Sequence, residues 1–500
     1  MTLDAAPAIV AVTLVTLATL TIGSFGLRLS RTTSDFFVAS RAVNPRLNAS
    51  AIGGEYLSAA SFLGIAGLVL TLGAEMLWYP IGWTAGYLVL LVLVAAPLRR
   101  SGAYTLPDFA EARLASRGVR ALCSMLVVAI GWLYLMPQLQ GAGITLHTIA
   151  EAPTWLGPVL VAAVVAANVG SGGMRSVTLV QAFQYWLKLT ALLVPGMVLL
   201  AVWLGDGAPR AMGGGEWSLP IADGGASGLY TTYSLILATF LGTMGLPHVS
   251  VRFYTNPDGA AARRTTVVVL GLLGAFYLFP PLFGALGRVY GAGPLAADTV
   301  VLELPRLMVD GALGEVLTGL VAAGAFAAFL STSSGLAIAI AGVLSQDVIA
   351  PTLAARRVSG VTAFRLAGVV AVAVPCLAAL AMPNVGVARA VGLAFAVAAS
   401  TFCPLLLLGI WWRRLTAVGA ALGLLVGFAG SGTAVVWTLG GWSAGGWWDT
   451  LLAQPAAWSV PAAFATMVGA SLLTAEHVPP HTNRLLVRLH TPETVELDRG

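Results

Sequence analysis

The sequence predicts an all-α membrane protein with about thirteen transmembrane helices, and three observations support this class. Hydrophobic residues make up 58% of the 500 residues and charged residues only 9%, whereas soluble proteins carry about 25% charged residues. The apolar residues come in blocks of about 20, the length of helix that crosses ~30 Å of hydrocarbon. The few basic residues gather in short loops between these blocks. We therefore expect one membrane transporter domain over residues 1–474, with no soluble domain beside it.

Thirteen apolar blocks are the expected spans. They cover residues 7–28, 49–71, 76–98, 120–146, 157–174, 177–204, 229–253, 265–287, 312–344, 363–382, 388–410, 415–440 and 456–474. Residues 475–500 remain as a short C-terminal tail, which we expect to be mobile.

The distribution of Lys and Arg predicts the orientation. With the N-terminus outside, 21 of the 26 Lys and Arg residues fall in cytoplasmic loops, among them Arg252 at the end of the seventh span. Lys188 falls inside a span, and four residues fall outside, namely Arg210, Arg288, Arg306 and Arg389. Because basic residues favour the cytoplasmic side, this asymmetry predicts an outside N-terminus and a cytoplasmic C-terminus.

Composition also narrows the partners. The net charge of +5 and the pI near 9.3 follow from basic loops between spans, so we expect membrane lipid as the surroundings and no nucleic acid. Cys123, Cys376 and Cys403 lie in apolar segments without the spacing of a disulfide framework or a metal site, and are expected to be packing residues. We expect no cofactor and no metal other than a sodium ion. The oligomeric state stays open.

Two spans place Gly or Pro beside polar residues near their middle, at residues 49–61 and 242–248. These interrupted spans lie five spans apart, so spans 2–6 and 7–11 would form two five-helix halves of opposite topology. Such inverted repeats are typical of secondary transporters, whose broken helices line the binding site. The expected core is residues 49–410. The alternative is that these glycines only let helices pack closely.

Several motifs carry a resemblance to a known family. They are Gly54–Gly64, Gly172–Arg175, Val180–Lys188, Gly245–Phe253, Ser331-Thr332 and Ser345–Asp347. Together they resemble the sodium/solute symporters, and within them the bacterial cation/acetate and monocarboxylate permeases, over about residues 33–415. The resemblance implies the leucine-transporter fold with spans 2–11 as its core, in a bacterial cell membrane. It also implies a secondary active symporter that couples sodium or proton entry to uptake of acetate, propionate or pyruvate by alternating access.

The resemblance further implies a sodium site. A dehydrated sodium ion needs about five or six oxygens, which unwound carbonyls and Ser or Thr hydroxyls supply. The matching positions are the carbonyls of Gly54, Leu57 and Ala328 with the hydroxyls of Ser331 and Thr332. The alternative is that both hydroxyls bond to carbonyls of their own helix.

A carboxylate substrate would be attracted by the N–H groups at the half-helix N-termini. The candidate substrate residues are Gly53 and Ser58 in span 2, Thr243 and Met244 in span 7, and Gln138 in span 4, which matches a recurrent family glutamine. Each of them is also compatible with ordinary helix packing.

Charged residues within spans are hypotheses of function by default because they are costly there. Lys188 shares a helix face with Gln184, and is expected to contact the anion, pair with Glu55, report proton coupling, or satisfy a structural carbonyl. His248 is the histidine deep in the core and a further coupling or gating candidate.

This chain also departs from the wider family. Several sodium-coupled relatives carry an acid at the position of Gln181, and some carry one at that of Tyr56. Both differences remove negative charge from the expected ion path, so the proton remains an alternative coupling ion.

Other function classes fit less well. The chain lacks metal-ligand spacing such as H-E-x-x-H, so we do not expect an enzyme. A membrane sensor or receptor on the same fold, or a symporter of another small organic solute, are the alternatives.

Overall fold

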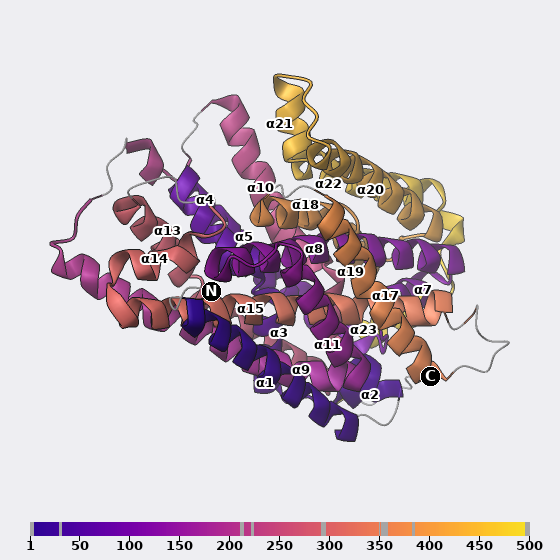
Figure 1. Cartoon of the computed structure of the whole chain (residues 1–500). Helices are drawn as coiled ribbons and strands as arrows, with labels where there is room; N and C mark the ends of the chain where they lie inside the picture. Colours follow the sequence, from indigo (N-terminus) through magenta and orange to yellow (C-terminus); the bar gives the residue numbers. More distant parts are fainter. Residues whose placement is uncertain are drawn as a thin grey trace.

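The structure is a computed structural model that describes residues 5–29, 33–210, 215–221, 225–291, 297–349, 351, 359–382 and 386–495. Within these residues the secondary structure is helical, which confirms the predicted class (Figure 1). The α-helices are α1 (Ala6–Leu29), α2 (Thr33–Val38), α3 (Pro45–Tyr56), α4 (Ile65–Leu72), α5 (Trp78–Val89), α6 (Ala95–Arg100), α7 (Leu106–Leu114), α8 (Arg117–Ala150), α9 (Leu156–Gly205), α10 (Ala226–Gly245), α11 (Pro247–Tyr254), α12 (Gly259–Phe276), α13 (Phe279–Tyr290), α14 (Val300–Met308), α15 (Gly311–Val343), α17 (Gly360–Ala381), α18 (Val387–Ser400), α19 (Phe402–Trp411), α20 (Ala417–Leu439), α21 (Trp447–Ala453), α22 (Ala456–Leu473) and α23 (Thr482–His490).

The described residues contain 11 helices long and apolar enough to cross a membrane, or up to 12 if the bent pair α3 and α4 is one span. The count is below the thirteen expected spans because two of them, residues 157–174 and 177–204, lie within the single helix α9. A helix of 50 residues would be about 75 Å long, more than twice the ~30 Å of a hydrocarbon core. Gly173 interrupts α9 with φ 56° and ψ −141°, and a Cβ there would lie 2.7 Å from the backbone of Phe36. The two expected spans therefore meet at Gly173.

Both predicted helix breaks are present. Helix α3 ends at Tyr56, and the chain bends by 69° before the second half of the span runs on through α4. Helix α10 ends at Gly245, and Leu246 is extended with φ −70° and ψ 121° before Pro247 starts α11. Proline suits the first turn of a helix because the N–H that it lacks would have no helical partner there. The two spans thus carry irregular backbone inside the bundle.

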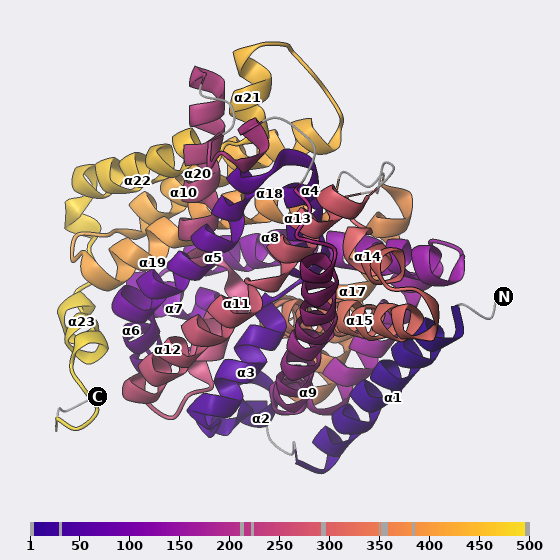
Figure 2. The same ribbon diagram turned by 90° about the vertical axis from the view of Figure 1, so that its left-hand side faces the viewer.

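Helix α15 forms the centre of the bundle. Every residue from Val321 to Val343 is buried, as expected for a helix surrounded by protein on all sides. Helix α9 packs along α15, α1 and α3, and α15 also packs against α8 and α17. Figures 1 and 2 show α20 and α22 side by side at the edge of the molecule, away from this centre.

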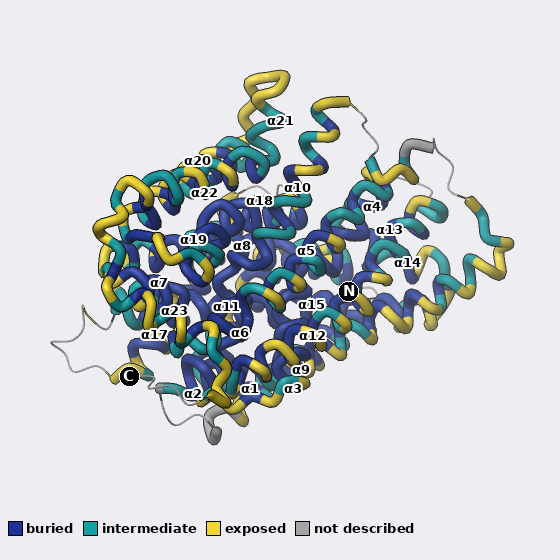
Figure 3. Tube along the Cα trace, turned by 180° about the vertical axis from the view of Figure 1, so that it is seen from behind, coloured by how far each residue is buried: buried dark blue, intermediate teal, exposed yellow. Residues whose placement is uncertain are grey.

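The outer surface is apolar where the helices are exposed. Leu278 is 71% exposed and Leu377 on α17 is 67% exposed. Figure 3 shows the buried residues in the interior and the exposed ones on the outer helices and at their ends. Large exposed apolar surfaces are rare on soluble monomers, whereas a lipid-facing surface requires them. The chain is a multi-pass membrane protein.

The structure places residues 475–495 of the C-terminal tail against the bundle, whereas the sequence predicts a mobile tail. Helix α23 packs against α6 with Leu489 buried. Arg113 donates a 3.1 Å hydrogen bond to the Thr482 hydroxyl, and Glu493 accepts one of 2.8 Å from the N–H of Gly259. The buried apolar residues Leu486 and Leu489, three positions apart, lie on one face of this short helix. Residues 496–500 lie outside the described residues.

Arg252, which the sequence predicts to lie in a cytoplasmic loop, lies elsewhere in the structure. Arg252 lies in α11, within the candidate span Ala226–Tyr254, and is 1% exposed, so it is buried in the bundle and is not an exposed loop residue. The side chain of Arg28 and all of Arg31, Arg356, Arg357 and Arg499, which the orientation also counts, lie outside the described residues. The outside N-terminus remains a prediction.

Candidate functional site

The break in span 2 leaves backbone groups that side chains of other helices satisfy. Leu57 has φ −74° and ψ 84°, outside the helical region. The N–H of Ala59, at the start of the second half of the span, donates a 2.9 Å hydrogen bond to Oε1 of Gln138 on α8. The carbonyls of Gly54 and Leu57 accept hydrogen bonds from Nζ of Lys188 on α9. Unpaired backbone groups are costly in a membrane interior, and these contacts provide partners for them.

The close approach of α3 and α9 makes these contacts possible. A Cβ on Gly54 would lie 2.1 Å from the carbonyl oxygen of Gln181, so only glycine allows the two backbones to come so near. Gly53 faces Tyr185, whose ring would be 2.8 Å from a Cβ. Lys188, on the same helix, then reaches the unwound segment while it is fully buried.

Three oxygens surround Lys188 Nζ, and we call them the oxygen cluster: the carbonyls of Gly54 and Leu57 and the hydroxyl of Ser331. The Leu57 and Ser331 oxygens lie 2.7 and 3.0 Å from Nζ. Carbonyl oxygens only accept hydrogen bonds, and Ser331 donates its own proton to the carbonyl of Ala328 at 3.1 Å. Nζ of Lys188 is thus placed to donate to all three oxygens, as an ammonium ion can with its three N–H groups.

The five expected sodium ligands come together in space, but each already has a partner. Gly54, Leu57 and Ser331 bind the Lys188 ammonium, and Ala328 accepts from Ser331. The Thr332 hydroxyl donates to the carbonyl of Glu55 at 2.6 Å, so it also points at span 2. With Lys188 in this position the ligand set does not fit a sodium ion.

Glu55 has a partner that sequence reasoning missed. Its carboxylate forms a buried ion pair with Arg252 on α11. Arg252 also donates to the hydroxyl of Thr178 at 2.9 Å and to the amide oxygen of Gln181. Gln181 in turn donates to the backbone carbonyl of Ser331 at 2.7 Å. This network joins α3, α9, α11 and α15 around the break.

A sequence signal for Arg252 existed. The residue lies within the expected span 229–253, where the rule that intramembrane charges mark functional sites applies to it as to Lys188.

Two other predicted coupling residues, Gln184 and His248, do not contact the oxygen cluster. Gln184 donates to the Thr19 hydroxyl on α1 at 2.9 Å and so reaches away from the oxygen cluster, although it shares a helix with Lys188. His248 lies beside the ring of Tyr134, with centroids 5.3 Å apart, and neither of its ring nitrogens has a hydrogen-bond partner among the described residues.

The candidate substrate residues surround the break but are largely engaged with protein. The hydroxyls of Thr243 and Tyr56 share a 2.7 Å hydrogen bond, and the Thr243 hydroxyl also lies 2.8 Å from the carbonyl of Thr239. Gln138 binds Ala59 as described above. Ser58 and Met244 are fully buried.

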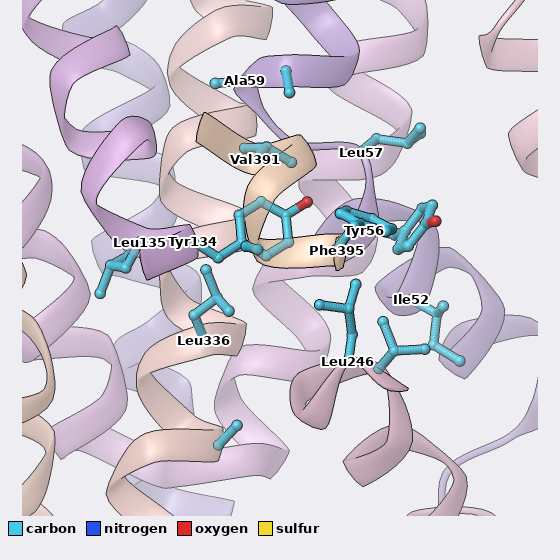
Figure 4. Packing of buried hydrophobic residues seen from close by; sticks show 14 of the residues in the cluster. Ile52, Tyr56, Leu57, Ala59, Tyr134, Leu135, Leu246, Leu336, Val391 and Phe395 are labelled. Atoms are coloured by element: carbon cyan, nitrogen blue, oxygen red, sulfur yellow. The ribbon is translucent and has the colours of Figure 1, made fainter. Parts of the chain in front are cut away.

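Aromatic rings form one side of the site, next to the gap in span 2. Phe395 on α18 lies between Tyr56 and Tyr134, with centroid distances of 6.3 and 5.9 Å (Figure 4). Trp83 on α5 lies 5.4 Å from Phe395, and Tyr87 lies 4.8 Å from Tyr56. The indole N–H of Trp83 and the hydroxyl of Tyr87 are buried and find no hydrogen-bond partner in the described part of the chain.

Comparison with known proteins agrees with this geometry. A sequence model of the sodium:solute symporter family matches residues 36–427. A protein of Bacillus subtilis (strain 168), described as the uncharacterized symporter YwcA, is 32% identical over 428 residues, which are 82% of this chain and 82% of that protein.

Solved structures share the fold. A substrate-bound, outward-open Na+-coupled sialic acid symporter has a TM-score of 0.71 and 16% identity, and the match covers 95% of this chain and 98% of that one. Mhp1, a nucleobase-cation-symport-1 family transporter, has a TM-score of 0.57 and 15% identity over 92% of this chain and 99% of its own. A mutant manganese transporter of Eremococcus coleocola has a TM-score of 0.52 and 14% identity over 90% and 97% of the two chains. At these identities the likeness shows the fold alone, which is the leucine-transporter fold.

Proposed function

The chain belongs to the sodium:solute symporter family, and we propose that it couples cation entry to uptake of a small monocarboxylate such as acetate, propionate or pyruvate. Transport would proceed by alternating access around the break in span 2. Sodium is the coupling ion that the family implies, and the proton is the alternative.

The charged residues buried at the break in span 2 are the main support for an anionic substrate. Glu55, Lys188 and Arg252 are each no more than 2% exposed. The Glu55 carboxylate pairs with Arg252, and no carboxylate among the described residues forms an ion pair with Lys188. Because an unbalanced buried charge is costly, a bound anion with a single negative charge would stabilise this site.

Two further features support a small carboxylate. The unpaired donors of Trp83 and Tyr87 offer hydrogen bonds to carboxylate oxygens. The rings of Tyr56, Tyr134 and Phe395 close around the same region, which favours a short acyl chain. A different small organic solute is the second candidate, since the sialic acid symporter and Mhp1 have the same fold and are named for other solutes.

Uptake by the purified protein in proteoliposomes tests the proposal. Labelled acetate, propionate and pyruvate are expected to enter faster than into protein-free liposomes. Unlabelled acetate should compete, whereas acetamide, which has a similar shape but no charge, should not. Equal competition by acetamide, or no uptake of any of the three acids above the lipid background, would rule out the monocarboxylate assignment.

A further inference from the structure

We propose that the ammonium of Lys188 is the resident cation of the oxygen cluster in this chain, and that sodium does not bind there. The inference builds on the proposed function, because it concerns the coupling site of that transporter. Its test needs no substrate, so the two proposals can fail separately.

The position of Lys188 leaves no room for a sodium ion in the oxygen cluster. Nζ of Lys188 lies within hydrogen-bond distance of all three oxygens of the cluster, and the side chain is fully buried. A sodium ion bound to the same carbonyls would lie within a few ångströms of the ammonium. Two like charges at that distance in a low-dielectric interior repel each other strongly. Sodium can therefore not share the cluster with Lys188.

The remaining expected ligands offer no second arrangement. The Thr332 hydroxyl is directed at the carbonyl of Glu55, and the carbonyl of Ala328 accepts from Ser331. A sodium ion would have to displace Lys188 and reorient both hydroxyls to gather its five or six oxygens. Lys188 would then be left buried without the acceptors it now has.

Lys188 also connects the helices around the oxygen cluster. The oxygen cluster joins the unwound segment of span 2 to α15, and Lys188 links both of them to α9. A dissolved ion would make that connection only while it is bound. The Lys188 side chain belongs to the protein, so this contact forms without sodium in the medium.

Thermal unfolding of the purified protein tests the proposal, with sodium chloride compared against choline chloride at equal ionic strength. In the wild type, sodium should not raise the Tm by binding to the oxygen cluster. Lys188→Ala removes the ammonium and leaves the oxygens, so sodium should raise its Tm by on the order of a few degrees. Adding Ser331→Ala to that variant should reduce the rise, while adding Thr433→Ala, which removes an exposed hydroxyl on α20, should not.

Two results would overturn the proposal. The first is a sodium-dependent rise in the wild type that Ser331→Ala abolishes, because sodium would then bind the cluster beside or instead of Lys188. This comparison remains valid if Lys188→Ala does not fold. The second is a folded Lys188→Ala protein without any sodium-dependent rise, because Lys188 would then not be what excludes sodium. A wild-type rise that survives Ser331→Ala would place sodium elsewhere, as the proposal allows.

Discussion

Lys188 on α9 donates a 2.7 Å hydrogen bond to the carbonyl of Leu57, the residue at which the second span leaves helical geometry. A charged side chain from one helix thus completes the backbone hydrogen bonding of another helix inside the bundle. The contact explains how the chain tolerates both a broken helix and a lysine at membrane depth, since each supplies what the other lacks.

Replacing Lys188 by methionine should lower uptake per molecule about tenfold or more. The carbonyls of Gly54 and Leu57 would lose their donor, and each unmet buried partner costs roughly 1–3 kcal/mol. Initial uptake rates divided by the amount of reconstituted protein measure the effect. Arg264→Met, at an exposed position on α12, is the matched control and should change little. A Lys188→Met protein with wild-type rate and substrate affinity would make Lys188 a packing residue.

Thr332→Ala should destabilise the contact between α15 and span 2. It removes the 2.6 Å hydrogen bond to the carbonyl of Glu55, which should lower the free energy of unfolding by about 1–3 kcal/mol. Thr332→Ser keeps the hydroxyl and should stay close to the wild type. Denaturation in detergent measures both variants, and the sodium concentration for half-maximal uptake should not differ between Thr332→Ser and the wild type. Equal stability of the alanine variant would mean that this hydrogen bond is dispensable.

The ion pair of Glu55 and Arg252 should show strong coupling in a double-mutant cycle. Glu55→Gln or Arg252→Met alone leaves a buried charge without its partner, which costs about 3–5 kcal/mol. The double variant should recover part of that loss, because neither charge is then left alone. Thermal stability of the four proteins measures the coupling. Additive losses would contradict a direct pair.

Single cysteines should test the predicted orientation. A cysteine at Ser116 should react with a membrane-impermeant reagent only from the cytoplasm, and one at Ser227 only from outside. The native Cys123, Cys376 and Cys403 are buried, so the background should be low. Labelling of both positions from the same side would refute the predicted topology.

The sequence was sufficient to predict the fold class, the two helix breaks and the energetic cost of burying Lys188 within a span, because each of these depends on local features. Hydrophobic blocks reveal spans, and Gly or Pro beside polar residues marks a break. Helix α9, which contains two expected spans, shows what hydrophobic blocks cannot predict. Whether the chain turns or only kinks at Gly173 depends on the packing against Phe36.

The partners within the site depend on tertiary structure and could not be read from spacing. Gln184 and Lys188 lie four residues apart on one helix, yet one reaches α1 and the other reaches span 2. The pairing of Glu55 with Arg252 joins residues 197 positions apart. The oxygens that the resemblance implies as ligands lie near one another in the structure, but that Lys188 lies among them follows from how closely α9 approaches Gly54.

Accumulation of labelled acetate in proteoliposomes, with inward sodium and proton gradients imposed separately, tests the central claim of cation-coupled carboxylate uptake most directly. Acetic acid itself crosses lipid, so the signal is the difference from protein-free liposomes under the same gradient. The account predicts that the wild type concentrates acetate above this background while a cation gradient lasts, and loses the excess when an ionophore collapses the gradient. Acetate that stays at the protein-free level under both gradients would contradict it.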